Sequence, residues 1–258
     1  MDDQQTRGWR LFVEKDGPTL RLRPGSRLLT TILPAVFPLL VVMIGIGLWL
    51  GLGRTSAIPT AERLSTWLLI TVPLALWLLV VSLLPRAGVY RAPLAIPAGV
   101  LLSPAVGLLL LTRLPHLPQL LDATPKSWLI GTMVVRLVGG GFLAAWASRE
   151  VPKPWFVVWA GSVDVFVGAT ALPLGWWVSS ASPVAVAIAV AWNLIGLLDF
   201  AVAMVISRRF PSAGPGYLVS SNTPILTALK PTALGIFTWG VPLAIMIHVL
   251  SLWQLLAA

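Results

Sequence analysis

The chain has 258 residues, of which 57% are hydrophobic and 10% are charged, and its mean hydropathy is +0.88. A soluble domain carries roughly 25% charged residues, so this composition excludes an ordinary soluble protein. The formal net charge of +9 would indicate a nucleic-acid partner in a soluble protein, but here we expect no nucleic acid, because basic residues also gather on one side of a membrane protein. The sequence therefore predicts an integral membrane protein that contacts the lipid bilayer.

The first 27 residues precede the apolar segments and form, on this prediction, a separate cytoplasmic segment. Within them, residues 9–23 show two short runs of alternating polarity on either side of Lys15-Asp16-Gly17-Pro18. This pattern predicts a β-hairpin. A lone two-stranded hairpin is only marginally stable in water, so we expect it to lie against the helix ends or the lipid headgroups.

The rest of the chain, residues 28–258, contains apolar windows of roughly 20 residues, each long enough for a transmembrane helix. The predicted fold class is all-α, a polytopic bundle of seven transmembrane helices. The first window is too long for a cleavable signal segment and is expected to stay as an anchor. The seven predicted spans cover residues 28–50, 66–84, 93–111, 127–147, 155–178, 184–206 and 232–256.

The distribution of Lys and Arg predicts the orientation of these helices. Most of the 18 basic residues fall in the N-terminal segment and in every second loop after it, whereas the opposite side carries Arg54, Arg63, Arg113 and Lys126. Basic loops stay in the cytoplasm. The N-terminus is therefore expected to be cytoplasmic and the C-terminus to lie outside, and residues 207–231 form a long cytoplasmic loop.

Four ionisable residues fall inside the predicted spans: Arg136, Asp164, Asp199 and His248. A charge at that depth is costly, so each is a candidate functional residue. The rise of a helix places Arg136, Asp164 and Asp199 about 10 to 16 Å from the cytoplasmic ends of their spans, in one depth zone. We expect these three side chains to meet inside the bundle, because small residues that permit close helix contact flank each of them.

An Arg136, Asp164 and Asp199 cluster contains one fixed cation and two carboxylates. The excess negative charge can be resolved by a bound proton, a cation or a cationic group of a ligand. A buried ion pair that only fixes how the helices pack is the alternative interpretation.

Asn193 and His248 form a second polar pair, about 20 and 24 Å from the cytoplasmic face by the same helix rise. His248 can serve as a proton acceptor, as an axial ligand of haem or chlorophyll, or as a hydrogen-bond partner of Asn193. Among the 13 tryptophans, Trp159, Trp192 and Trp239 fall deep in the spans, where they either line a ligand or pigment cavity or pack in the core.

Three stretches carry a resemblance to a known family: residues 160–168 (AGSVDVFVG), 192–200 (WNLIGLLDF) and 241–250 (VPLAIMIHVL). Their Gly-x-x-Asp helix, Trp-Asn helix with a downstream Asp, and Pro-to-His helix resemble an uncharacterised family of hypothetical bacterial multi-pass membrane proteins. The resemblance covers about residues 127–256. It implies a bacterial inner-membrane location and groups Arg136, Asp164, Asn193, Asp199 and His248 into one constellation, and it implies no substrate.

Enzymatic chemistry is disfavoured by the residues that the chain lacks. It has no cysteine, no H-E-x-x-H and no G-x-S-x-G, and no lysine within a span to bind retinal as a Schiff base. A metal site that combines His248 with the carboxylates is not expected, because helix rise separates them by about 11 to 14 Å in depth. The residues name no cofactor.

Three classes of function therefore stay open. A small-molecule or proton-linked transporter would use the Arg136, Asp164 and Asp199 cluster as its binding site. A membrane receptor or sensor would use a similar cavity and signal through the 207–231 loop. An accessory subunit would pack within a homo-oligomer or a larger membrane complex, with or without a pigment.

Overall fold

The computed structural model describes residues 13–16, 19–22, 35–56, 58–84, 95–147, 155–209 and 224–257. The first described elements are two strands, β1 (Val13–Asp16) and β2 (Thr19–Leu22), which pair antiparallel and lie within the stretch for which the sequence predicts a hairpin. The β2 strand contacts a helix near the C-terminal end of the chain, α12 (Pro224–Gly235).

All other elements in the described ranges are helical. Most of these helices are apolar around their whole circumference, so they pack against one another or face lipid. In chain order they are α3 (Val36–Arg54), α4 (Thr60–Leu83), α5 (Ala95–Leu111), α6 (Leu117–Ala123), α7 (Lys126–Thr132), η3 (Met133–Gly139), α8 (Gly140–Ala147), α9 (Trp155–Val178), α10 (Pro183–Arg209), α12, η4 (Ile236–Gly240) and α13 (Val241–Leu256).

Five of the described helices are long and apolar enough to cross a membrane: Val36–Arg54, Thr60–Leu83, Trp155–Val178, Pro183–Arg209 and Lys230–Leu256. They correspond to five of the seven predicted spans. The other two predicted spans fall on shorter helices. Residues 93–111 contain α5, which has 17 residues, and residues 127–147 are divided among α7, η3 and α8. These lengths support an integral membrane protein with an all-helical bundle.

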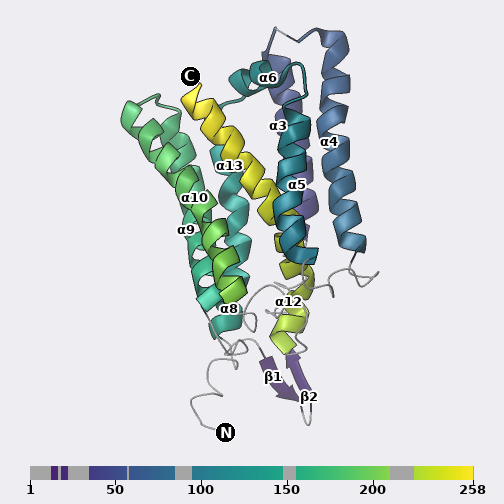
Figure 1. Ribbon diagram of the computed structural model, residues 1–258, viewed down its shortest axis with the longest axis vertical. Coiled ribbons are helices and arrows are strands. Elements are labelled where there is room, and N and C mark those ends of the chain that lie inside the picture. Colours follow the sequence, from purple (N-terminus) through teal and green to yellow (C-terminus); the bar gives the residue numbers. More distant parts are fainter. Residues whose placement is uncertain are drawn as a thin grey trace.

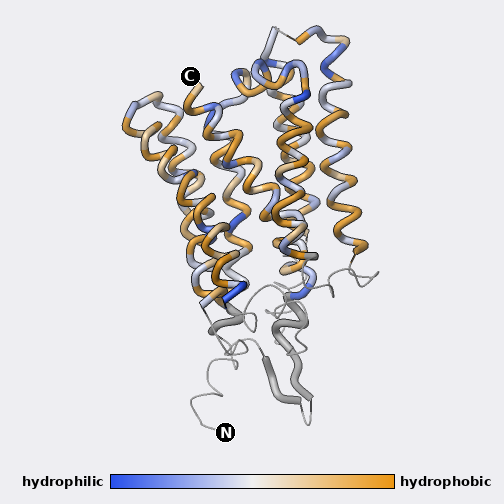
Figure 2. Tube along the Cα trace, in the orientation of Figure 1, coloured by the Kyte–Doolittle hydropathy of each residue, from blue (hydrophilic) through white to orange (hydrophobic). Residues whose placement is uncertain are grey.

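The long helices run side by side along the long axis of the molecule (Figure 1). The hairpin and α12 lie at one end of the molecule, and α6 lies at the opposite end, beside the C-terminal end of α13. Figure 2 shows hydrophobic residues along the long helices and hydrophilic residues gathered toward the two ends. We call the end that carries α6 and the C-terminus the C-terminal face.

Two predicted spans contain irregular helical turns. The fourth passes through η3, a 3₁₀-helix of seven residues, and the last passes through η4, a π-helix of five residues. Runs of 3₁₀-helix longer than three or four residues are uncommon, and π-helical turns are frequent at functional sites. The prediction of a loop over residues 207–231 is wrong at both ends, because α10 continues to Arg209 and α12 begins at Pro224.

The α12 helix begins at Pro224, and a proline at the first helical position lacks only an N–H that would have no partner there. Its second proline, Pro231, stands inside the helix. The two prolines that helped to predict a loop are therefore part of a helix, and the predicted loop is shorter than expected at this end.

Candidate functional site

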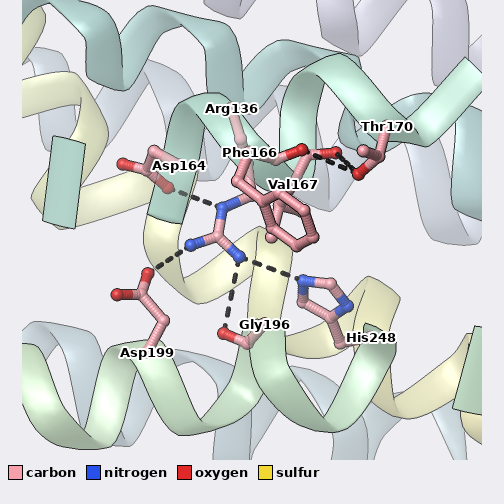
Figure 3. Close-up of polar contacts among 8 residues, drawn as sticks. All are labelled: Arg136, Asp164, Phe166, Val167, Thr170, Gly196, Asp199 and His248. Atoms are coloured by element: carbon pink, nitrogen blue, oxygen red, sulfur yellow. Dashed lines mark hydrogen bonds and ion pairs between the residues drawn. The ribbon is translucent and has the colours of Figure 1, made fainter. Parts of the chain in front are cut away.

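Arg136 stands at the centre of η3, and its guanidinium lies among helices η3, α9, α10 and α13. Its Nε atom donates to Oδ1 of Asp164 at 2.6 Å, and its Nη2 atom donates to Oδ2 of Asp199 (Figure 3). The Nη1 atom donates to the Gly196 carbonyl at 3.4 Å and to Nε2 of His248 at 3.3 Å. Four of the five guanidinium N–H groups thus have an acceptor.

The cluster is buried within the bundle, and Asp164 is its most exposed member, at 8%. Arg136 is 5% exposed, Asp199 is 3% exposed and His248 is 0% exposed. One face of the guanidinium is covered by Phe200, whose ring centroid lies 4.5 Å from Cζ of the arginine. An aromatic face at this distance attracts a cation, so Phe200 adds to the stabilisation that the carboxylates provide.

The 3₁₀ geometry of η3 decides which residues flank Arg136. With three residues per turn, Met133, Arg136 and Gly139 lie on one face, and all three are buried. In the α-helix that the sequence predicts here, Thr132, Gly139 and Gly140 share the face of Arg136. Gly139 then brings η3 against α9, because a Cβ added at this position would collide with the Asp164 side chain.

Two further glycines permit close contact between the helices that form the site. A Cβ at Gly168 would lie 2.7 Å from the backbone nitrogen of Leu137, so α9 and η3 touch through their backbones. A Cβ at Gly196 would collide with the His248 ring and would lie 3.2 Å from Nη1 of Arg136. Small residues beside the charges therefore permit the ion pairs, as the sequence predicts from the small residues that flank each charge.

His248 links the charges to a chain of neutral polar groups. A guanidinium can only donate, so Nε2 of His248 accepts from Arg136 and the ring proton belongs on Nδ1. The Nδ1–H group then donates to Oδ1 of Asn193 at 2.8 Å. The Asn193 Nδ2 group donates in turn to the Ala189 carbonyl at 2.8 Å and to Oγ of Ser251 at 3.1 Å.

These hydrogen bonds indicate that His248 is a neutral imidazole with its proton on Nδ1. Both ring nitrogens are occupied, so an axial bond from His248 to haem or chlorophyll would require one of these hydrogen bonds to break. Of the three roles that the sequence left open, the structure contains the hydrogen bond to Asn193.

The sum of charges at the site is negative when both carboxylates are ionised. Oδ2 of Asp199 accepts from Arg136, whereas Oδ1 is buried and accepts no hydrogen bond of ordinary geometry among the described residues, although the Trp159 side chain lies near this carboxylate. An unpartnered carboxylate oxygen in an apolar interior is unfavourable. A proton on Oδ1 would remove the excess charge and leave every bond of Arg136 intact.

The three candidate cavity-lining tryptophans lie in different surroundings. Trp192 is buried beside His248, at 5.4 Å between ring centroids, and its Nε1 donates to Oγ1 of Thr170 at 2.9 Å. Trp239 is fully buried against Phe37 and Trp77, whereas Trp159 is 41% exposed. No ring contact joins the three in the described part of the chain. Trp192 borders the cluster beside His248, and the Trp159 side chain lies within reach of the Asp199 carboxylate.

The five predicted binding residues, Arg136, Asp164, Asn193, Asp199 and His248, lie in one hydrogen-bonded group. The sequence places Asn193 and His248 as a second pair, apart in depth from the charges, and side-chain hydrogen bonds join this pair to Arg136. Helix rise measures the depth of backbone positions, and the long arginine side chain spans the difference. Ser251 was missed, although it follows His248 by three residues on the same helix face, a spacing that the sequence contains.

A polytopic helical membrane protein with a buried, hydrogen-bonded charge cluster is thus the class that the fold and the site define. Residues 94–256 match a domain of unknown function, DUF8737, and because the match covers more than half of the chain, the protein belongs to this family. The matched residues contain every member of the cluster. Comparison with curated proteins and with solved structures finds no match.

Proposed function

We propose that the protein is a proton-linked membrane transporter whose binding site is the cluster of Arg136, Asp164, Asp199 and His248. The observation that carries this proposal is the unbalanced charge of one guanidinium against two buried carboxylates, with no described hydrogen bond of ordinary geometry to Oδ1 of Asp199. Ionisable residues inside a membrane commonly mark ion pathways and proton relays.

In the proposed transport cycle, Asp199 binds a proton in one state and a cationic group of the transported molecule in the other. Either one neutralises the same excess charge, so the two compete for one carboxylate and their movements are coupled. Arg136 stays charged throughout, because a guanidinium does not lose its proton in proteins. Its role is to hold both carboxylates and His248 in fixed positions.

The topology that we propose for this transporter has seven crossings in the inner membrane of a bacterium. In addition to the five long helices, α5 and the continuous α7–η3–α8 segment supply the sixth and seventh crossings. An odd number of crossings between them agrees with the positions of the hairpin and of the C-terminal end of α13 at opposite ends of the bundle in Figure 1. The basic residues of the predicted loops favour a cytoplasmic N-terminus.

A packing role is the second candidate, because nearly all donors of Arg136 are already satisfied within the protein. In that case the cluster fixes the contacts among four helices and binds nothing, as expected of an accessory subunit. A buried ion pair with this purpose gains nothing from a second carboxylate, and for that reason we favour transport.

Proteoliposomes that enclose a pH-sensitive dye distinguish the two candidates. We expect an imposed pH gradient to drive uptake of at least one member of a panel of small amines and amino acids, with matching proton movement. Asp199→Asn keeps the shape of the side chain and removes its titratable oxygen, so it should abolish this coupling in a protein that still melts cooperatively. Asp122→Asn, an exposed substitution in α6, is the control. Unchanged pH dependence in Asp199→Asn would reject the proton-binding role.

A further inference from the structure

Polar side chains continue from the cluster toward the C-terminal face along α13. His248, Ser251 and Gln254 follow one another at intervals of three residues, so they lie on neighbouring turns of one helix face. All three are buried, with exposed fractions of 0%, 2% and 7%. The distance from His248 to Gln254 along the helix is about 9 Å, which brings this polar row to the last turn of α13.

The row is hydrogen-bonded at its inner end. His248 donates to Asn193, and Asn193 donates to Ser251, as described above. Ser251 accepts this bond through Oγ, and its own hydroxyl proton has no described acceptor. One turn farther, Oε1 of Gln254 is a buried acceptor without a partner among the described residues.

The outer end of the row is closed by α6. Nε2 of Gln254 donates to the carbonyls of Leu121 and Thr124, each at 2.5 Å, at the C-terminal end of this short helix. The buried face of α6, formed by Leu117, Leu120 and Leu121, lies toward the bundle. The Gln254 side chain thus bonds α13 to the C-terminal end of α6.

We propose that this polar row is the route by which water reaches the Arg136 cluster from the C-terminal face, with Gln254 and α6 as its outer closure. Amide groups do not carry protons, so a proton moves along this route on water, which Ser251 and Gln254 position. Water between the Ser251 hydroxyl and Oε1 of Gln254 satisfies both groups at once. The proposal rests on the proposed function, because it supplies protons to the same site.

The chain contains no cysteine, so single cysteines can report solvent access along the route. Ser251→Cys and Gln254→Cys are placed on the row, and Leu255→Cys is the matched control. Leu255 is 5% exposed and belongs to the apolar core at nearly the same depth. The probe is a small membrane-impermeant thiol reagent with a quaternary ammonium group, added separately to each side of the membrane.

We expect Ser251→Cys and Gln254→Cys to react from the C-terminal side faster than Leu255→Cys by about tenfold or more. Equal rates for all three positions would show fraying of the helix end, and reaction of Ser251→Cys only from the opposite side would place the route elsewhere. Either result overturns the proposal. Ser251→Cys changes one atom, and its melting curve establishes that the protein is folded.

The same variants separate this proposal from the proposed function. If the two row positions react as expected while Asp199→Asn leaves proton coupling unchanged, the water route stands and the role of Asp199 as the proton site fails. If proton coupling depends on Asp199 but neither row position reacts from the C-terminal side, the transporter stands and its access lies on another path.

Discussion

Arg136 and Asp199 are 63 residues apart in the chain, yet Nη2 of the arginine donates to Oδ2 of the aspartate in the interior of the bundle. Oδ1 of Asp164 accepts from Nε of the same guanidinium. The two carboxylates therefore share a single cation, and the number of charges left after each substitution determines its effect on stability.

Charge-removing substitutions test this sharing. Arg136→Ala leaves two buried carboxylates without a cation, and loss of one partner of a buried pair costs about 3 to 5 kcal/mol in soluble proteins. Arg136→Leu with Asp164→Leu leaves one carboxylate, and adding Asp199→Leu leaves none. We expect melting temperatures in detergent to rise in that order, with exposed Arg113→Leu unchanged from the wild type. A double variant that melts well below Arg136→Ala would mean that Arg136 and Asp164 are not partners.

The close approach of α9 to η3 predicts that alanine substitutions at two glycines have different effects on stability. Gly168→Ala forces a Cβ against the backbone nitrogen of Leu137, which no side-chain rotation relieves, so we expect a loss of about 1 to 3 kcal/mol. Gly99→Ala in α5 meets no atom within 4 Å and should be neutral or stabilising, because alanine favours a helix interior by about 0.5 to 1 kcal/mol. Equal melting temperatures for the two variants would contradict this packing of α9 on η3.

The sequence predicts much of this site because helix periodicity and small residues determine which faces can meet. Gly139, Gly168 and Gly196 mark the faces that carry the charges, and the structure brings those faces together. The 3₁₀ turns around Arg136 leave no comparable signal in the apolar sequence, since the same residues suit an α-helix. These turns pack closely against α9.

Contacts of long side chains were harder to predict than helix faces. Estimates from helix rise place His248 farther from the cytoplasmic face than the two carboxylates. The Arg136 side chain nevertheless contacts His248, Asp164 and Asp199 from one backbone position. The bond from Gln254 to α6 joins residues more than 100 positions apart, and no local pattern encodes that pairing.

The hydrogen bonds of His248 predict a single tautomer. Nitrogen NMR of histidine-labelled protein should find Nδ1 protonated and Nε2 unprotonated, because Nε2 accepts from Arg136. Asn193→Ala removes the acceptor of the Nδ1 proton and should shift this balance, whereas a substitution of the half-buried His116, which pairs with Glu62, should leave the His248 signal unaltered. A doubly protonated His248 in the wild type would contradict the assigned bond to Arg136.

The seven-crossing topology predicts opposite sides for the two ends of the chain. Alkaline phosphatase is active only outside the cytoplasm, and a fusion at residue 258 should therefore be active in cells, whereas a fusion in the 207–231 region should be inactive. A fluorescent protein that matures in the cytoplasm provides the reciprocal control. Activity on the same side for both positions would indicate an even number of crossings between residues 231 and 258.

Infrared spectroscopy of the protein in lipid bilayers measures the protonation of Asp199 most directly. A buried carboxyl group with a proton has a C=O band separate from that of a carboxylate, and exchange into D₂O shifts it. We predict that one such band appears in the wild type as the pH is lowered, and that Asp199→Asn lacks it at every pH while Asp122→Asn retains it. The absence of the band from folded wild-type protein, or its persistence in Asp199→Asn, would contradict a proton-binding cluster centred on Asp199.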